Sequence, residues 1–282
     1  MAEGLEELLS TIEKVVSGDM EKSALENLRA SRRDIPDQIF EEAFMAIDGL
    51  LDSIPRRRLG IFIVIAGLDK SGKETQAFNP YGLPGVKSIR SYLEERSFKV
   101  LSISLPSYRT ILGALVGAYL EDRGHRSSIE RPSVKIVGNL SSEYAWILWS
   151  LDRARQNLKV REWLQKGKRF LVLSKRWTES HLAYQRALGI EESRILKFER
   201  NIVQPDFTFI LDIPAEEVIK RAKNASIHPD RYENMDFLNK VREGYLDLYK
   251  RQFPGKIILI DGTRSPEEVN KEIIEALKSL GL

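Results

Sequence analysis

The segment GLDKSGKET, residues 67–75, carries the clearest chemistry in the sequence. It satisfies the pattern G-x-x-x-x-G-K and stands between an apolar run and a helix start, the context in which this pattern binds phosphate. Its glycines let backbone N–H groups turn inward around a phosphate, and Lys73 adds a point charge. The competing interpretation is a glycine turn with a solvated lysine. We expect nucleotide phosphates to be bound by Gly67, Asp69, Lys70, Ser71, Gly72, Lys73, Glu74 and Thr75.

One position of this loop departs from the pattern. The residue after Lys73 is ordinarily a Ser or Thr whose hydroxyl binds Mg²⁺. In this sequence it is Glu74, and Thr75 follows one place late. Because a carboxylate can also bind Mg²⁺ directly, Glu74 is the candidate metal ligand.

Five short apolar runs lie after Arg58, at residues 59–67, 99–105, 169–174, 207–213 and 256–261. They are nearly continuous and rich in β-branched residues, which is typical of strands buried on both faces of a parallel sheet. Segments with helical spacing lie between and after them, at residues 134–164, 215–224, 236–252 and 266–280. Because strands and helices alternate, we expect an α/β fold with a five-stranded parallel sheet and helices on both faces.

The first part of the chain has a different character. Its apolar residues recur at helical spacing without any strand-like run, which predicts two or three amphipathic helices. We therefore expect an all-helical N-terminal extension, residues 1–57, ahead of an α/β domain, residues 58–282. The junction carries the basic run Arg56, Arg57 and Arg58, which we interpret as a solvated linker. The alternative is a contact with an anion or a partner.

Composition limits the function classes. The chain has 282 residues, and its 44 basic and 41 acidic side chains leave a net charge of only +3. So small an excess argues against a dedicated nucleic-acid binder. The absence of cysteine excludes thiolate metal sites and cysteine nucleophiles. No apolar run is long enough to span a membrane and the first residues are acidic, so we expect a soluble, cytoplasmic protein that does not bind membranes.

Six segments follow one family's sequence pattern in order. GLDKSGKETQ is similar to its phosphate loop, LPSYRTILGALVGAYL to its F-P-x-R-x-T segment, and WSLDRAR has an aromatic residue four places before an arginine. SKRWTESHLAYQ is similar to D-R-Y-x-x-S-x-x-A-Y-Q, QPDFTFILDIPAEEVIKR to K-P-D-x-x-[IFL]-x-L-D-[VL]-P, and DFLNKVREGYLDL to a late helix. Over residues 59–282 the sequence therefore resembles the thymidylate kinase family, with the P-loop NTPase fold that this implies.

The resemblance implies an activity and its cations. It implies transfer of the γ-phosphoryl group of ATP to dTMP, giving dTDP and ADP, with Mg²⁺ as the usual companion of ATP. Lys73, Lys70 and Arg176 would be the catalytic cations, because negative charge develops on the phosphoryl oxygens. A lid over residues 187–203 would add Arg194, Lys197 and Arg200, whose alternative interpretation is a solvated charged helix.

The resemblance also implies how the acceptor nucleotide is bound. Asp69 would hold the sugar, and an aromatic side chain would stack on the base. That side chain is Trp149 by the alignment, although tryptophans on one long helix are more often core residues. The full set implied for the acceptor is Asp69, Trp149, Arg153, Arg176, Tyr184 and Gln185. Partners would be small nucleotides and a second copy of the chain, since members of this family commonly form homodimers.

Two departures from the family pattern are coupled in chemistry. Glu74 replaces a hydroxyl, and Lys175 replaces the aspartate of the D-R-Y segment. Both positions face one metal ion in the family, so we hypothesise that Glu74 and Lys175 form an ion pair across the metal position. An unpaired acid there would repel phosphates, by about 4 kcal/mol per close unit-charge pair at an effective dielectric constant near 20.

Two further departures concern the backbone around the site. After Gln76 the sequence AFNPYGLPG carries prolines and glycines that break the helix following the phosphate loop. In LPSYRT, Tyr108 occupies the usual arginine position and Arg109 comes one place late. Two other functions therefore stay open: a nucleotide-binding protein with impaired catalysis, and a phosphotransferase with another acceptor or donor.

Overall fold

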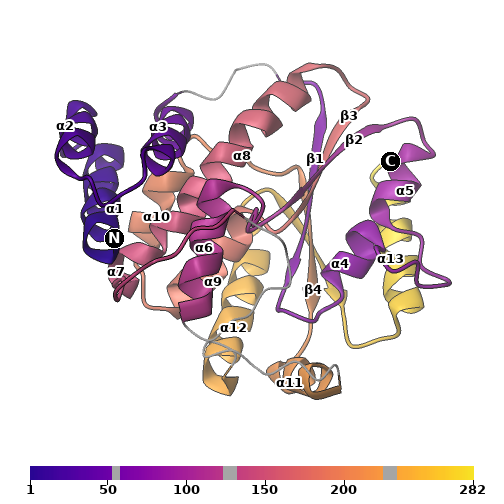
Figure 1. The fold of residues 1–282 in the computed structure, drawn as a ribbon. Coiled ribbons are helices and arrows are strands. Elements are labelled where there is room, and N and C mark those ends of the chain that lie inside the picture. The colour runs from indigo at the N-terminus through magenta and orange to yellow at the C-terminus, as the bar shows by residue number, and fades with distance from the viewer. Residues whose placement is uncertain (53–57, 123–131, 225–233) are drawn as a thin grey trace. The chain divides into compact units, whose positions relative to one another are not determined.

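The computed structural model describes residues 1–52, 58–122, 132–224 and 234–282 (Figure 1). The chain forms two compact units, each built from three segments. Unit 1 comprises Met1–Pro55, Leu105–Lys159 and Ile190–Val203, and unit 2 comprises Arg56–Ser104, Val160–Gly189 and Gln204–Leu282. The N-terminal helices thus share a unit with later segments. The boundary expected at residue 57 lies outside the described residues, and the two-domain division stays a prediction.

Unit 2 contains the five-stranded sheet that the apolar runs predict. Its strands pair in the order β2-β3-β1-β4-β5, and every pair is parallel. The strands are β1 (Ile61–Gly67), β2 (Lys99–Ser104), β3 (Phe170–Lys175), β4 (Phe207–Asp212) and β5 (Lys256–Asp261). Because β1 is central and β3 and β4 flank it, the segments that follow these three strands emerge side by side.

Helices cover both faces of this sheet, as expected (Figure 1). One face packs against α4 (Lys73–Phe78), α5 (Ile89–Glu94) and α13 (Pro266–Ser279) in a core of mostly aliphatic side chains. The other face carries α9 (Thr178–Ala187) and α12 (Met235–Arg251), and α11 (Ala215–Asn224) follows β4. On that second face Phe62 packs edge-on against Trp177, with ring centroids 5.1 Å apart.

Unit 1 is helical and includes the predicted N-terminal helices α1 (Ala2–Ser17), α2 (Ser23–Ser31) and α3 (Asp37–Leu51). The others are α6 (Ile111–Asp122), α7 (Ser142–Ala145), α8 (Ile147–Gln165, in this unit as far as Lys159) and α10 (Glu192–Glu199). Between residues 111 and 119 α6 has buried side chains on every side, so it must be covered all round. Contacts with α3 supply part of that cover, and α1 contacts α7 and α10.

Two sequence expectations need correction. The helix expected over residues 134–164 begins only at Ser142, because Gly138 adopts a left-handed φ of 100° and Ser141 caps the helix that follows. Of the basic run, Arg56 and Arg57 lie outside the described residues. Arg58 is not part of a solvated linker: it is ion-paired with Asp206, and burial lowers its pKa to about 10.

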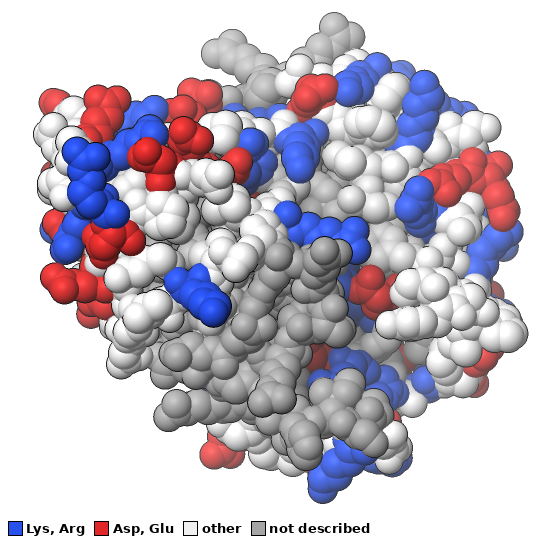
Figure 2. Space-filling view, viewed as in Figure 1, with Lys and Arg blue, Asp and Glu red and all other residues white. Residues whose placement is uncertain are grey.

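On the face of the molecule shown in Figure 2, basic and acidic side chains alternate over the N-terminal helices. Lys and Arg side chains are intermingled there with Asp and Glu (Figure 2), and Arg29 and Arg32 are both ion-paired with carboxylates. Within the described ranges, no helix is both long enough and apolar enough to cross a membrane.

Candidate nucleotide-binding site

The segment between β1 and α4 has the backbone of a phosphate-binding loop. Gly67 lies at φ 133°, and a Cβ added there would collide with the carbonyl oxygen of Leu211 on β4. Lys70 and Gly72 adopt left-handed φ values of 60° and 93°. Such alternations of backbone conformation aim successive N–H groups to one side and create a concave anion site. The loop therefore has the form that its sequence predicts.

Lys73 and Ser71 point inward from this loop. Lys73 is 5% exposed, and its Nζ donates to the carbonyl oxygen of Leu68 at 2.6 Å. Burial holds the pKa of Lys73 well below its usual range, and the positive charge of Arg176 lowers it further. The Ser71 hydroxyl is buried without a hydrogen-bond partner in the described part of the chain. A bound phosphate would stabilise the protonated Lys73 and give this hydroxyl an acceptor.

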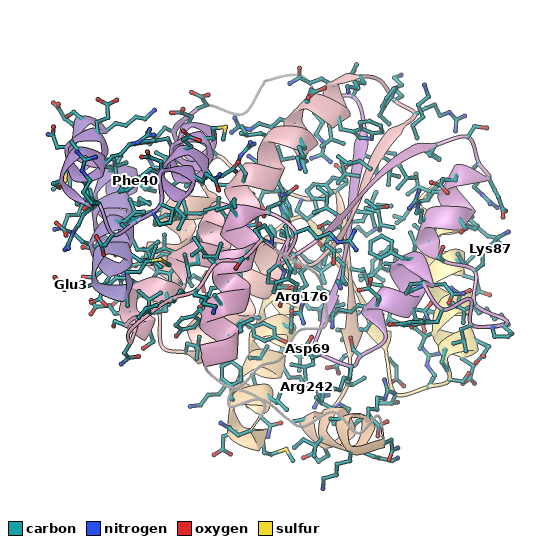
Figure 3. The ribbon with its side chains drawn as sticks, in the orientation of Figure 1. Glu3, Phe40, Asp69, Lys87, Arg176 and Arg242 are labelled. Atoms are coloured by element: carbon teal, nitrogen blue, oxygen red, sulfur yellow. The ribbon has the colours of Figure 1, made fainter. Side chains whose placement is uncertain are left out.

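Arg176 meets Asp69 beside the loop (Figure 3). Arg176 follows β3 in a left-handed conformation, φ 72°, and its N–H donates to the carbonyl oxygen of Ile65 at 2.9 Å. This uncommon conformation turns the side chain toward the loop, where the guanidinium is ion-paired with Asp69 and 14% exposed. Partial withdrawal from water raises the pKa of Asp69, but Arg176, Lys73 and Lys70 outweigh it and hold that pKa far below the usual range. Asp69 is therefore an anionic acceptor, and Arg176 is a fixed cation.

Two tyrosines contact the Arg176 guanidinium. Both the Tyr184 and Tyr245 hydroxyls lie 3.4 Å from its nitrogens, and the guanidinium lies over the Tyr184 ring, 5.0 Å from the centroid. Tyr245 donates to Ser180 at 2.8 Å, and Ser180 donates to the buried carboxylate of Glu179 at 2.9 Å. Burial raises the pKa of Tyr245 to about 12, which keeps its hydroxyl protonated. The arginine at the site is thus positioned by a hydrogen-bonded chain that reaches a buried acid.

The hypothesis of an ion pair between Glu74 and Lys175 is confirmed. Glu74 is the second residue of α4 and Lys175 is the last residue of β3, and their side chains are in direct contact. The carboxylate is 45% exposed and the ammonium 22% exposed. The pair therefore lies at the surface of the phosphate loop, beside Lys73.

The residues present do not fit a protein-held magnesium ion. P-loop NTPases hold that ion with a loop hydroxyl and an aspartate after a neighbouring strand. Here the hydroxyl position is Glu74 and the position at the end of β3 is Lys175, and these two side chains are ion-paired with each other. Asp212, at the end of β4 on the other side of the central strand, accepts from two nitrogens of Arg242 at 2.7 and 2.8 Å. Asp69 is paired with Arg176. Across the part of the chain that the structure describes, no three metal-binding side chains gather. Each of these three carboxylates, Glu74, Asp69 and Asp212, already has a cationic partner.

Two arginines that support the site are not among the residues predicted from the sequence. Arg221 on α11 donates to the carbonyl oxygens of Lys70 at 3.1 Å and Gly262 at 2.9 Å. These bonds connect the backbone of the phosphate loop to the segment that follows β5. Arg242 on α12 immobilises Asp212. Both lie in segments that matched the family pattern, so their presence there was a usable signal, but nothing in their spacing indicated these partners.

The helix after the loop is as short as its prolines and glycines predict. It ends at Phe78, and Asn79 follows in a left-handed conformation. The Asn79 side chain then organises the next turn by accepting from Leu83 N–H and donating to the carbonyl oxygens of Leu83 and Val86, over 2.8–3.1 Å. The break is therefore an ordered structure.

Unit 1 contains the two residues assigned to the base of the acceptor. Trp149 is partly exposed and packs edge-on against Tyr119, with ring centroids 5.7 Å apart. Trp146, which lies between α7 and α8, is buried. The family resemblance therefore points to the more accessible of these two tryptophans. Arg153 is ion-paired with Glu199, and both side chains are 3% exposed. Its guanidinium is thus already engaged by α10.

The lid residues also contact their own unit. Arg194 binds both carboxylate oxygens of Glu13 at 2.7 and 2.8 Å, and Lys197 donates to the Ser17 hydroxyl at 3.1 Å. Arg200 is exposed. Two of the three cations therefore attach α10 to α1, and their role toward phosphate stays a prediction.

The loop after β2 is held by a buried acid. Asp152 is 1% exposed and accepts from the Ser107 N–H at 2.7 Å and from Thr110 Oγ1 at 3.4 Å. Burial raises the pKa of Asp152 to about 6. Arg109 belongs to the same loop and is exposed.

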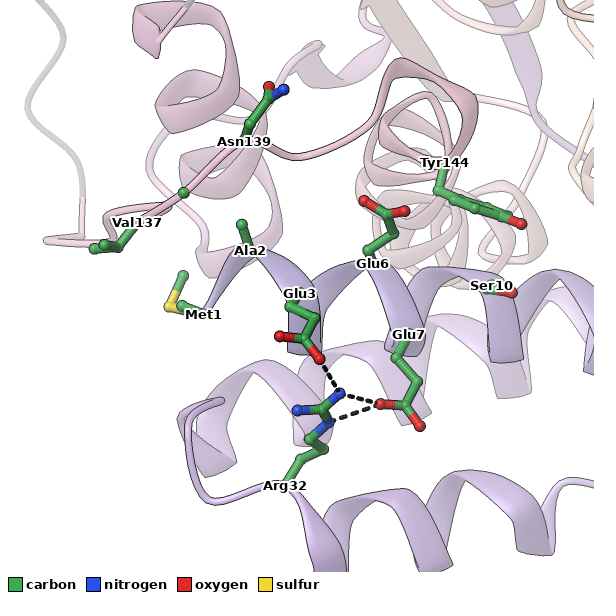
Figure 4. Close-up of a pocket in the computed structure, with 11 residues that line it drawn as sticks. Met1, Ala2, Glu3, Glu6, Glu7, Ser10, Arg32, Val137, Asn139 and Tyr144 are labelled. Carbon is green, nitrogen blue, oxygen red and sulfur yellow. Dashed lines mark hydrogen bonds and ion pairs between the residues drawn. The ribbon is translucent and has the colours of Figure 1, made fainter.

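A hollow in unit 1 differs in character from the phosphate loop. It is formed by the start of α1, Arg32 and residues 137–139, with a volume of about 740 Å³ (Figure 4). Its one arginine is paired with Glu3 and Glu7, and Glu6 accepts from the Ser141 N–H at 3.1 Å. Its charges are mutually satisfied, so it offers no comparable anion site.

A parallel sheet of order β2-β3-β1-β4-β5, with a G-x-x-x-x-G-K loop after its central strand, defines a P-loop NTPase fold. The thymidylate kinase family model matches residues 65–273. The chain therefore belongs to the thymidylate kinase family.

Individual relatives agree with this assignment. A probable thymidylate kinase from Thermococcus gammatolerans is 30% identical over 217 residues, which are 77% of this chain and 95% of that protein. A thymidylate kinase from Kosmotoga olearia is 32% identical over 232 residues, covering 78% of this chain and 99% of that protein. The solved thymidylate kinase of Candida albicans is similar in fold, with a TM-score of 0.58 and 22% identity over 80% of this chain and 94% of that one.

Proposed function

We propose that this chain transfers the γ-phosphoryl group of ATP to dTMP, giving dTDP and ADP. The observation that carries the proposal is the meeting of Lys73, Arg176 and the phosphate loop at the end of the central strands, in a member of the thymidylate kinase family. Positive charge fixed before the reaction is what phosphoryl transfer requires most.

In this proposal the loop N–H groups, the Ser71 hydroxyl and Lys73 bind the phosphates of ATP. Arg176 neutralises charge on the phosphoryl group in flight, and Lys70 adds to the field from the loop. The mechanism consists of positioning and electrostatic stabilisation, without a covalent intermediate. No step is assigned to a magnesium ion held by the protein, because Glu74 is engaged by Lys175.

The acceptor is bound in unit 2 by Asp69, with Tyr184 and Gln185 on α9 beside it. Gln185 supports this placement, since it is 3% exposed and its Oε1 has no hydrogen-bond partner in the described part of the chain. Recognition of the base stays a prediction for Trp149 and Arg153. A homodimer and a cytoplasmic location also belong to the proposal, and light scattering of the purified chain tests the first of these.

The test is ADP formation from ATP with dTMP, compared with other nucleoside monophosphates under the same conditions. Turnover should depend on dTMP, and Lys73→Met and Arg176→Met should each lower kcat/KM by about 100-fold or more, as expected for loss of one preorganised charge. Lys87→Met is the matched control, because Lys87 is paired with Glu95 at an exposed position of unit 2. Turnover without any dependence on a monophosphate would contradict the proposal.

A further inference from the structure

We propose that the Lys175 ammonium, held by Glu74, takes over the electrostatic role of a protein-bound magnesium ion, so that this chain binds ATP with similar affinity with and without magnesium. This inference rests on the proposed binding of ATP at the phosphate loop. It concerns what the chain's own residues supply to that site.

The positions of the two residues carry the first part of the argument. β3 lies directly beside β1, and Lys175 pairs in register with Ile65, two residues before the loop begins at Gly67. An acidic residue after such a neighbouring strand and a hydroxyl after the loop lysine are what ordinarily hold magnesium. In this chain the first position is basic and the second is acidic, and the two side chains bind each other. The Lys175 ammonium therefore stands where an acidic side chain would ordinarily bind the magnesium ion.

The two exchanged residues also change the net charge beside the phosphate loop. A hydroxyl and an aspartate would together contribute a charge of −1, whereas Glu74 and Lys175 together contribute zero. The exchange therefore makes the protein's own charge at the loop more positive by one unit. Residues 67–75 and 174–176 carry four basic side chains (Lys70, Lys73, Lys175 and Arg176) and two acidic ones (Asp69 and Glu74), a net charge of +2 before any ion binds. Triphosphate oxygens can be neutralised by groups that the fold already holds.

The Glu74–Lys175 pair is too exposed for stability alone to explain it. Surface ion pairs contribute little to stability, because water and salt screen them. Glu74 and Lys175 are 45% and 22% exposed, so stability does not explain why two matched departures face each other here. Glu74 instead aims the flexible lysine side chain, and a paired Glu74 does not repel phosphate as a free carboxylate would.

Isothermal titration calorimetry with ATP on the full chain tests this, once in EDTA and once in excess magnesium. For the unchanged chain we expect the two Kd values to agree within about threefold. Lys175→Met leaves Glu74 unpaired beside the phosphates, so Kd in EDTA should rise by about tenfold or more, and magnesium should recover part of the loss. The double variant Glu74→Ser with Lys175→Asp restores the ordinary residues and should bind ATP about tenfold or more tightly with magnesium than without it.

Lys87→Met is again the control, because it makes the same chemical change in another lysine–glutamate pair, which lies away from the loop and is more exposed, at 47% and 53%. Thermal unfolding of each variant establishes that it is folded. If the unchanged chain binds ATP only with magnesium, the inference is overturned while the proposed function stands. If ATP binds in neither buffer, the proposed function fails and the inference fails with it.

Discussion

Glu199→Gln removes the carboxylate that is paired with the buried guanidinium of Arg153. Both side chains are 3% exposed, and two Arg153 nitrogens contact the Glu199 carboxylate. Breaking a pair so far from water leaves a charge that neither solvent nor salt can screen, at a cost of about 3–5 kcal/mol. With about 2–4 °C lost per kcal/mol for a chain of this size, Tm should fall by roughly 6–20 °C.

The same helix supplies a matched control. Arg155, two residues further along α8, is paired with Glu42 at 2.7 Å, but these side chains are 24% and 25% exposed. Glu42→Gln should therefore cost only about 0–1 kcal/mol and lower Tm by less than about 4 °C. The two variants make the same chemical change on pairs that differ in burial.

Circular dichroism of the full chain during heating measures both shifts. A third variant, Arg153→Met with Glu199→Leu, removes both charges and should be more stable than Glu199→Gln alone, because no charge is left buried. Equal Tm shifts for Glu199→Gln and Glu42→Gln would refute the argument from burial.

Three other predictions follow from single side chains. Asp152 has a pKa of about 6 in the folded chain, against an ordinary value of 3.8. The contribution of the protonated carboxyl to the free energy of unfolding is therefore complete below pH 3.8 and falls by about 3 kcal/mol as the pH rises to 6. Asp152→Asn should abolish that part of the pH dependence, measured by urea unfolding. Tyr245→Phe deletes a hydroxyl that donates to Ser180 at 2.8 Å, and should cost on the order of 1 kcal/mol by the same method while raising KM for the nucleotides; an unchanged KM would separate this hydroxyl from substrate binding. Gly67→Ala forces a Cβ against β4 and should cost about 3 kcal/mol, whereas Gly189→Ala, at φ 87° with open space around it, should cost only about 1 kcal/mol; similar losses at both positions would show that the collision is relieved.

The sheet and the phosphate loop could be predicted because their signals are local. Continuous apolar runs specify strands buried on both faces, and Gly67 and Lys73 stand at fixed spacing after one of them. The contact between Glu74 and Lys175 was also predictable although 101 residues separate them. An acid replaces a hydroxyl and a base replaces an acid at two positions that face one metal ion in the family. Side chains of opposite charge so placed are expected to form an ion pair.

Contacts without such a shared reference point could not be predicted. Arg153 pairs with Glu199 across 46 residues, and Arg194 with Glu13 across 181, and no periodicity in the sequence marks either partner. Asp152 was overlooked for a related reason. A carboxylate in a charged helix is usually solvated, and only tertiary packing reveals that this one is buried on the Ser107 N–H.

The N-terminal helices contact segments that come much later in the chain, and this has a consequence for synthesis. Unit 1 ends at Val203, so α1 and α3 leave the ribosome long before α6 and α10, which they pack against. At 5–20 residues per second, the wait from residue 55 to residue 203 is on the order of ten seconds or more. During that time α1, α2 and α3 can contact one another, but part of their apolar surface still lacks the later helices that cover it, and α10 is the last of these to be made. A chaperone that binds amphipathic helices would therefore be expected to meet this protein at its first fifty residues, well before the sheet can form.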